Sequence, residues 1–258
     1  MVIVQTGEHK FHLDGYLKSN LDTVKKDVKK DYDAFICVTG REGFGKTTIA
    51  GQIAVYLDPT FNLDRCCFND EQFKEAVVHA KQYEAIVFDE TMGYLSSRGA
   101  MSKFNRSLIK IFSEMRSKNL FIILCISNFF ELDRYPAMHR STGLIHIKKR
   151  GQFGSYDYKK KKKLYLEGKK TYSYGVPPTF IGRFVKYFVL NKEAYSKKKA
   201  QAIEEWEIKK NIEKKLREQR DNLIIECYNK KFLTIPLLAK VVKLTEGQIR
   251  RILTLREA

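Results

Sequence analysis

Short apolar runs alternate with longer amphipathic stretches through about the first 150 residues. The apolar runs have the length of buried strands and cover residues 34–39, 66–68, 85–88, 121–126 and 144–147. The amphipathic stretches predict helices over residues 14–31, 46–57, 70–81 and 104–115. Strands that alternate with helices are typical of a parallel sheet covered on both faces. We therefore expect an α/β fold built on a doubly wound, mostly parallel sheet.

The pattern changes after residue 148. Residues 148–176 mix glycine and tyrosine with many lysines, which predicts β-hairpins added to the sheet edge. Residues 192–220 show a long, highly charged helical pattern, and an all-α unit follows. We accordingly divide the chain into a core (1–147), a basic β-hairpin extension (148–190), a helical linker (191–220) and a helix-turn-helix-like domain (221–258).

Charge is divided unevenly along the chain. The net charge is +18, of which residues 1–147 carry +1 and residues 148–258 carry +17. A fold does not require this asymmetry, whereas a polyanionic partner such as DNA would explain it. A solvated lysine-rich surface is the alternative explanation.

Composition also bears on the location of the protein. No apolar run is long enough to cross a bilayer, and the N-terminus lacks the features of a signal peptide. The five cysteines have no CxxC spacing, which favours buried thiols over disulfides or a zinc site. We expect a cytoplasmic protein without membrane insertion.

A glycine-rich segment connects the first of these apolar runs to the next helical stretch. Residues 40–47 read GREGFGKT and match the full pattern G-x-x-x-x-G-K-[ST] in the strand-to-helix context that a phosphate-binding loop requires. Glycines let backbone N–H groups turn toward phosphate oxygens, and the N-terminus of the following helix adds positive potential. We expect the following residues to bind ATP: Gly40, Arg41, Glu42, Gly43, Phe44, Gly45, Lys46, Thr47 and Thr48.

Two adjacent carboxylates end the apolar run at 85–88. Asp89 and Glu90 belong to the segment IVFDET, and a buried strand rarely ends in two acids without a functional reason. We expect Lys46 to reach the β- and γ-phosphates, and Thr47 and Asp89 to hold Mg²⁺. Glu90 is then placed to orient and deprotonate an attacking water, so the pair of acids predicts ATP hydrolysis.

The strand expected at 121–126 ends in Ser127 and Asn128. A polar side chain at this point would lie between the two acids and the phosphate. Asn128 could hydrogen-bond the γ-phosphate or the attacking water and so report the nucleotide state. Capping of the strand end is the alternative role.

Together these motifs resemble the additional-strand, glutamate-using P-loop ATPases, most of all the FtsK–HerA-type DNA motors and their zonular-occludens-toxin-like relatives. The resemblance covers about residues 15–150 and rests on GREGFGKTT, IVFDE and EMRSKNLFIILCISNFFELDRYPAMHR. It implies a P-loop NTPase fold and a ring, often a hexamer, that hydrolyses ATP at subunit interfaces and moves DNA. Such a ring needs an arginine from a neighbouring subunit. The candidates are Arg98, Arg116, Arg134 and Arg140, with Arg116 and Arg140 first.

The basic half contains a run of five lysines between tyrosines: Lys159, Lys160, Lys161, Lys162 and Lys163. Basic residues beside aromatic rings suit phosphate contacts and base stacking. A solvated hairpin tip would have the same composition.

The C-terminal segment predicts two short helices, over residues 234–242 and 245–254, separated by a brief turn as in a helix-turn-helix. Thr245 and Gln248 fit a capping box, T-x-x-Q. Gln248, Arg250 and Arg251 would face outward, toward bases or phosphates of DNA. A small helical bundle for oligomer contacts is the alternative.

We therefore expect an ATP-hydrolysing motor that uses Mg²⁺ and acts on duplex DNA as a homo-oligomeric ring. Two other interpretations stay open. An AAA+-like replication initiator or helicase loader usually has a helical lid directly after the core, where this chain has its lysine-rich segment. A DNA-binding regulator could use ATP only as an assembly switch, and turnover strongly stimulated by DNA would separate it from a motor.

Overall fold

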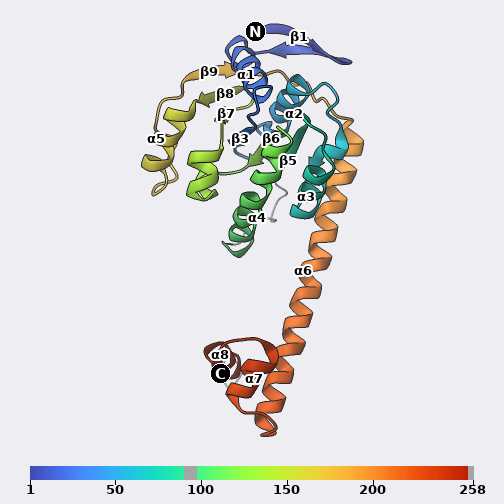
Figure 1. Ribbon diagram of the computed structural model, residues 1–258, viewed down its shortest axis with the longest axis vertical. Helices are drawn as coiled ribbons and strands as arrows, with labels where there is room; N and C mark the ends of the chain where they lie inside the picture. Colours follow the sequence, from blue (N-terminus) through green and yellow to red (C-terminus); the bar gives the residue numbers. More distant parts are fainter. Residues whose placement is uncertain (90–97, 255–258) are drawn as a thin grey trace. The chain divides into compact units, whose positions relative to one another are not determined.

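The computed structural model describes residues 1–89 and 98–254 of the chain (Figure 1). It divides into two compact units, Met1–Ala202 and Ile203–Ala258. The strands of the first unit are β1 Val2–Thr6, β2 His9–Leu13, β3 Ala34–Gly40, β4 Cys66–Cys67, β5 Ala85–Asp89, β6 Phe121–Ile126, β7 Gly143–Lys149, β8 Gln152–Tyr156 and β9 Phe180–Arg183. Its helices are α1 Gly15–Val28, α2 Lys46–Leu57, α3 Asp70–His79, α4 Arg98–Ser117, α5 Tyr158–Gly168 and the first turns of α6 Lys192–Asn229.

The centre of the first unit is a mixed, mostly parallel seven-stranded sheet in the order β4-β5-β6-β3-β7-β8-β9. All neighbours from β4 to β7 are parallel, and β8 and β9 join by antiparallel pairing. The apolar runs thus form parallel strands joined by helical crossovers, as their alternation with helices predicted. Strand β6 lies between β3 and β5, so the ends of these three strands meet at one edge.

Both faces of the sheet are covered, because alternate residues of each buried strand point to opposite sides. Ile36 and Val38 of β3 pack in one cluster with α1 and α2, and Phe35 and Cys37 pack in another with α3, α4 and α5 (Figure 1). The α/β expectation is confirmed at this level. The β1–β2 hairpin, which the apolar pattern did not predict, covers part of the first cluster, and its Thr6 hydroxyl donates a hydrogen bond to the Val55 carbonyl at 2.9 Å.

The structure corrects the expectation of β-hairpins for the lysine-rich segment. One hairpin is present, formed by β7 and β8, but the lysine run lies in helix α5. Asp157 caps this helix by accepting a hydrogen bond from the Lys160 backbone N–H at 2.9 Å. The buried residues of α5 follow the helical period: Lys161, Leu164, Tyr165 and Gly168. Because residues 159–163 are all lysine, the sequence shows no alternation of apolar and polar residues from which this period could be predicted.

The second unit consists of the later part of α6, helix α7 (Ile235–Val242) and helix α8 (Glu246–Thr254). Its small core joins Ile224, Leu238, Ala239 and Ile249. The two short helices are therefore as predicted, with Ile249 inward. The predicted capping box is also confirmed, since the Thr245 N–H donates to Gln248 Oε1 at 2.9 Å and the Gln248 N–H donates to Thr245 Oγ1 at 3.3 Å.

Two expectations drawn from composition can be compared with the structure. All five cysteines are free, and Cys37, Cys66, Cys67 and Cys125 are buried, which confirms the prediction of buried thiols. Within residues 1–89 and 98–254, no helix is both long and apolar enough to cross a membrane.

Candidate functional site

The glycine-rich segment forms the loop between β3 and α2, at the sheet edge where β3, β5 and β6 end. Gly40 and Gly45 have φ angles of +143° and +99°, a region that L side chains rarely adopt. A Cβ at Gly40 would lie 2.9 Å from the Ile147 carbonyl oxygen, and one at Gly45 would lie 3.0 Å from the Phe184 ring. Glycine is thus needed at both positions. The loop is open to solvent, with Arg41, Glu42 and Gly43 exposed and Phe44 to Thr48 half-buried.

The structure brings together three of the residues expected to bind the nucleotide and its metal. The Thr47 hydroxyl donates a hydrogen bond to Asp89 Oδ2 at 2.9 Å, across 42 positions of sequence. The Lys46 ammonium donates to the Gly40 carbonyl at 2.8 Å and so lies across the mouth of the loop. The parallel register of β3, β6 and β5 produces this proximity, because the strands carry Gly40 and Asp89 to the same edge of the sheet.

The residues at this point suit a hard divalent cation. A hydroxyl and a carboxylate are the oxygen ligands that Mg²⁺ prefers, and it usually takes one or two protein groups together with phosphate oxygens and water. Asp89 is only 2% exposed, so its negative charge is held in a poorly solvated place beside the open loop. Thr47 and Asp89 are the residues that would hold the ion.

Two residues that the sequence pattern did not identify reach the same carboxylate from α6. The Tyr195 hydroxyl donates a hydrogen bond to Asp89 Oδ2, and the Lys199 ammonium lies 3.4 Å from the same oxygen. Burial, followed by the charge of Asp89, raises the pKa of the Tyr195 hydroxyl, which keeps it protonated and able to donate. These residues are more than 100 positions from Asp89, so spacing alone offered no signal for them.

Arg150 is a third residue that the pattern missed. It lies in the turn between β7 and β8, is exposed, and its Nε donates a hydrogen bond to the Gly43 carbonyl at 2.9 Å. A guanidinium beside a phosphate-binding loop can contact phosphate oxygens with several donors. The signal available in the sequence was the basic segment that begins here, which we assigned to DNA as a whole.

Asn128 follows β6 at the expected edge, and its side chain accepts a hydrogen bond from the Phe130 backbone N–H at 3.1 Å. It therefore caps the helical turn Phe129–Glu131, which follows the strand. Its expected contact with the γ-phosphate or the attacking water stays a prediction. The neighbouring Phe129 N–H donates to the Tyr174 hydroxyl at 2.9 Å. Tyr174 stacks on His146, whose pKa burial lowers to about 4, so this imidazole is neutral near pH 7.

The arginines expected to act across a subunit interface differ in their surroundings. Arg116 is exposed at the end of α4. Arg140 instead forms a two-point ion pair with Asp33, and its guanidinium stacks 4.7 Å above the Phe112 ring. Asp33 directly precedes β3, at the strand end opposite the phosphate loop. The ion pair and the stacking give Arg140 a structural role within its own chain. Its expected role across a subunit interface stays a prediction.

Glu90, the expected water-orienting acid, lies outside the described residues. The same holds for the side chain of Arg98. Glu90 follows Asp89 in the chain, and Asp89 marks the end of β5 as the structure describes it.

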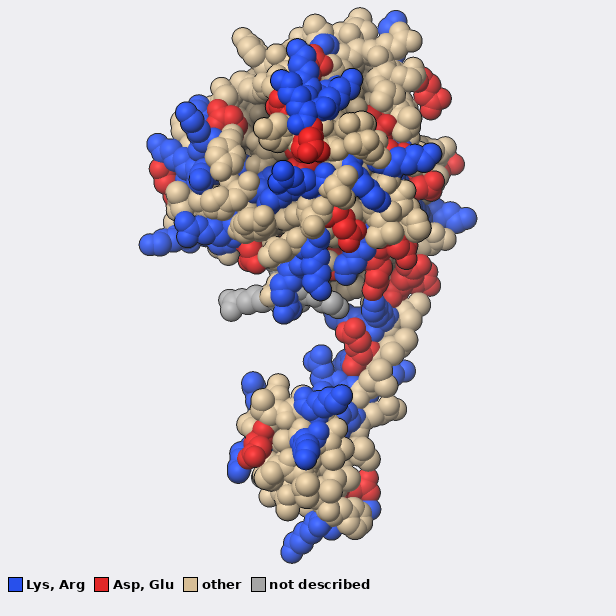
Figure 2. Space-filling model, viewed as in Figure 1, with Lys and Arg blue, Asp and Glu red and all other residues tan. Residues whose placement is uncertain are grey.

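The structure also divides the lysine run. Lys159 and Lys163 are exposed, whereas Lys160 and Lys162 are half-buried. Lys161 is fully buried, and its ammonium donates hydrogen bonds to the Ser141 carbonyl and, at 2.6 Å, to the Ser141 hydroxyl. Lys161 therefore cannot contact DNA from the surface of this fold, because α5 turns it toward the core. Over the face drawn in Figure 2, basic side chains of the first unit are interspersed with acidic ones.

In the second unit, Gln248, Arg250 and Arg251 are exposed on α8, as predicted for residues that could meet DNA. The Gln248 side chain also takes part in the capping box, which holds its Oε1 against the Thr245 N–H. Arg250 lies 4.0 Å from the Glu246 carboxylate. The Glu246 carboxylate, one turn before Arg250, therefore opposes part of the Arg250 charge.

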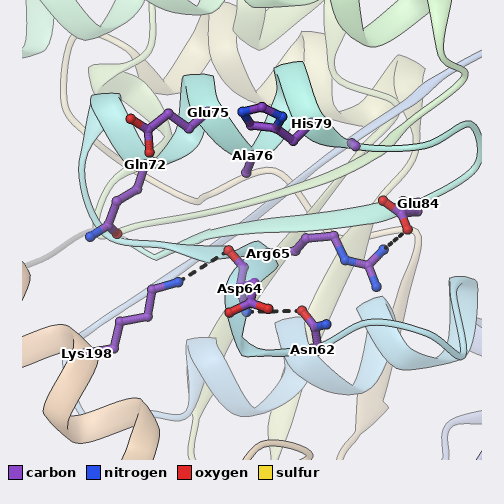
Figure 3. Close-up of a pocket in the computed structure, with 10 residues that line it drawn as sticks. Asn62, Asp64, Arg65, Gln72, Glu75, Ala76, His79, Glu84 and Lys198 are labelled. Atoms are coloured by element: carbon purple, nitrogen blue, oxygen red, sulfur yellow. Dashed lines mark hydrogen bonds and ion pairs between the residues drawn. The ribbon is translucent and has the colours of Figure 1, made fainter.

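A separate polar pocket of about 430 Å³ lies between α3, the segment around β4 and α6 (Figure 3). It contains none of the loop residues, so it is distinct from the site at Asp89. Arg65 closes its floor through ion pairs with Asp58 at 2.6 Å and with Glu84 at 3.2 Å. Lys198 enters from α6 and donates hydrogen bonds to the carbonyls of Leu63 and Cys66 at 2.8 and 2.9 Å. The polar side chains of Arg65 and Lys198 thus have partners within the fold, and the Lys198 hydrogen bonds join α6 to the segment around β4.

Comparison with known proteins adds no assignment: no protein-family model matches this sequence, and no curated protein shows significant similarity to it.

Proposed function

We propose that this chain is a P-loop ATPase that uses Mg²⁺·ATP to move DNA as a homo-oligomeric ring. The observation that carries the proposal is the hydrogen bond between Thr47 and Asp89 at 2.9 Å, beside a loop that matches the phosphate-binding pattern in full. Strand β6 between β3 and β5 supports the same assignment, because its end lies between the phosphate-binding loop after β3 and the acid at the end of β5.

The chemistry follows from the groups at the sheet edge. The backbone N–H groups of the loop and the N-terminus of α2 would hold the phosphates, and Lys46 would turn from the Gly40 carbonyl toward them. Mg²⁺ at Thr47 and Asp89 would neutralise charge on the phosphate oxygens. Glu90 would orient and deprotonate the water, as its place directly after Asp89 indicates.

DNA is the proposed polymer because the positive charge is concentrated in residues 148–258. The exposed lysines of α5 would contact phosphates, and the two short helices of the second unit would act as a helix-turn-helix. The observed segment after β7 argues against the initiator or loader alternative. That segment contributes β8, α5 and β9, where that class usually has a helical lid.

The test uses the full chain, filter binding of labelled ATP and phosphate release with and without duplex DNA. Lys46→Ala should lose tight ATP binding, whereas Glu90→Gln should keep binding and lose turnover. Lys30→Ala removes an exposed lysine near the opposite end of β3 and should behave like the wild type. Wild-type turnover by Glu90→Gln would contradict the assignment of the acid. Turnover that DNA does not stimulate would favour the assembly switch over the motor.

A further inference from the structure

Two side chains from the first turns of α6 reach the Asp89 carboxylate, which we assign to the metal. Three donors converge on one oxygen atom, Asp89 Oδ2: the Thr47 hydroxyl at 2.9 Å, the Tyr195 hydroxyl and the Lys199 ammonium at 3.4 Å. A carboxylate oxygen has about two lone-pair sites, so this oxygen is fully used. A metal ion that binds it must displace a donor.

Lys199 and Tyr195 also stabilise the buried Asp89 carboxylate, by an ion pair and a hydrogen bond, when no metal is bound. The Asp89 side chain is 3% exposed, and the Lys199 side chain beside it is 30% exposed. A buried carboxylate is costly unless it is paired and hydrogen-bonded. The lysine thus supplies positive charge, and the tyrosine supplies a hydrogen bond, at the place where the cation would supply both.

The start of α6 has separate contacts that hold it on the sheet. The Tyr195 ring packs edge-on against Phe68 and Phe188, with ring centroids 5.2 and 5.1 Å apart. The Lys198 ammonium donates hydrogen bonds to the carbonyl of Leu63, just before β4, and to that of Cys66, in β4. Because these contacts do not involve Asp89, the hydroxyl and the ammonium can leave the carboxylate without removal of the helix from the core.

We infer that Tyr195 and Lys199 form a latch that competes with Mg²⁺ for Asp89, so that binding of a magnesium–nucleotide complex breaks their contacts with the carboxylate. The first turns of α6 then loosen but stay packed on the sheet. This inference rests on the proposed function, because it takes Asp89 as the metal-binding acid. Its consequence is regulatory: α6 is the element through which the chain continues into the second unit, and its first turns would sense whether the metal site is filled.

The test measures the Mg²⁺ requirement for binding of a fluorescent, non-hydrolysable ATP analogue by the full chain. Tyr195→Phe keeps the packed ring and removes only the hydroxyl, and Lys199→Met keeps the stem and removes the charge. Each variant should lower the half-saturating Mg²⁺ concentration by about tenfold, the equivalent of one charge-assisted hydrogen bond. Binding of the analogue in EDTA should stay unchanged. Lys197→Met, which removes an exposed lysine of the same helix, is the matched control and should leave the Mg²⁺ requirement unchanged.

Hydrogen–deuterium exchange of residues 192–202 provides a second readout. In the wild type, the magnesium–analogue complex should speed exchange in this segment, and Tyr195→Phe should already exchange faster without ligand. An unchanged Mg²⁺ requirement in both variants would overturn the latch. A raised requirement would also overturn it, because it would mean that the two residues orient Asp89 for the metal. If the wild type binds no analogue, or Lys46→Ala binds it as tightly as the wild type, the proposed function itself fails and the latch falls with it.

Discussion

Arg140 offers a sharp test, because its observed surroundings and its expected role across a subunit interface predict different phenotypes. Its guanidinium pairs with Asp33, and the two side chains are 19% and 11% exposed. The same guanidinium lies 4.7 Å from the centre of the Phe112 ring. Arg140→Met keeps an apolar stem against this ring but leaves the Asp33 carboxylate without its partner.

The expected loss of stability follows from this burial. Breaking a fully buried pair costs about 3–5 kcal/mol, and an exposed pair contributes about 0–1 kcal/mol. The pair of Arg140 and Asp33 is mostly but not fully buried, so we expect a loss of about 2–3 kcal/mol. In a unit the size of Met1–Ala202, this corresponds to a fall in Tm of about 5–10 °C.

Differential scanning calorimetry is the suitable assay, since it can resolve separate transitions of the two units. Arg116→Met is the matched control, because Arg116 is exposed, and its effect should stay below about 0.5 kcal/mol. The double variant Asp33→Asn/Arg140→Met should recover part of the loss, which measures the coupling directly. ATP turnover per folded molecule should remain near the wild-type value in Arg140→Met.

The reasoning would be refuted by the opposite pair of results. If Arg140→Met melts like the wild type yet has no turnover, and mixing it with Glu90→Gln restores activity, then Arg140 completes the site of a neighbouring subunit. The ion pair would in that case be only one of two arrangements of this side chain.

Three further predictions concern the lysine-rich helix α5. Gly168→Ala should lower the free energy of unfolding by about 2 kcal/mol or more in calorimetry, because the new Cβ would lie 2.3 Å from the Ser173 carbonyl oxygen and 2.5 Å from the Phe130 ring; no loss would show that the turn after α5 relaxes freely. Burial lowers the pKa of Lys161 to about 8, below the unfolded value of 10.5, so above pH 8 the unfolded chain binds one proton more than the folded chain. The stability of the wild type relative to Lys161→Met, measured by urea titration, should therefore rise between about pH 8 and 10. A difference that does not change with pH would contradict the burial of this amine. The double variant Lys159→Ala/Lys163→Ala should reduce the salt slope of duplex binding in anisotropy titrations by about 1.8, or about 0.9 per phosphate contact, and an unchanged slope would remove α5 from the DNA surface.

The sequence by itself determined the elements of the core and the position of its chemistry. Apolar runs of strand length between amphipathic stretches require burial on two faces, which only a sheet covered by helices provides. The loop pattern and the acid at the end of a strand are local features, and parallel pairing carries both to one edge. The meeting of Thr47 with Asp89 could therefore be predicted, and the capping box at Thr245 was predictable because its two partners are three residues apart.

Tertiary structure alone decided which charged side chains are free to act. Five consecutive lysines carry no period, and only the packing of α5 turned Lys161 inward. Arg140 pairs with Asp33 although 107 positions separate them in the sequence, and Tyr195 contacts Asp89 across 106 positions. No spacing rule links partners so distant, because their approach depends on the order of the strands and on the path of α6 back to the sheet. Local pattern decides what a segment becomes, whereas the partners of its polar side chains depend on the segments that the completed fold places beside it.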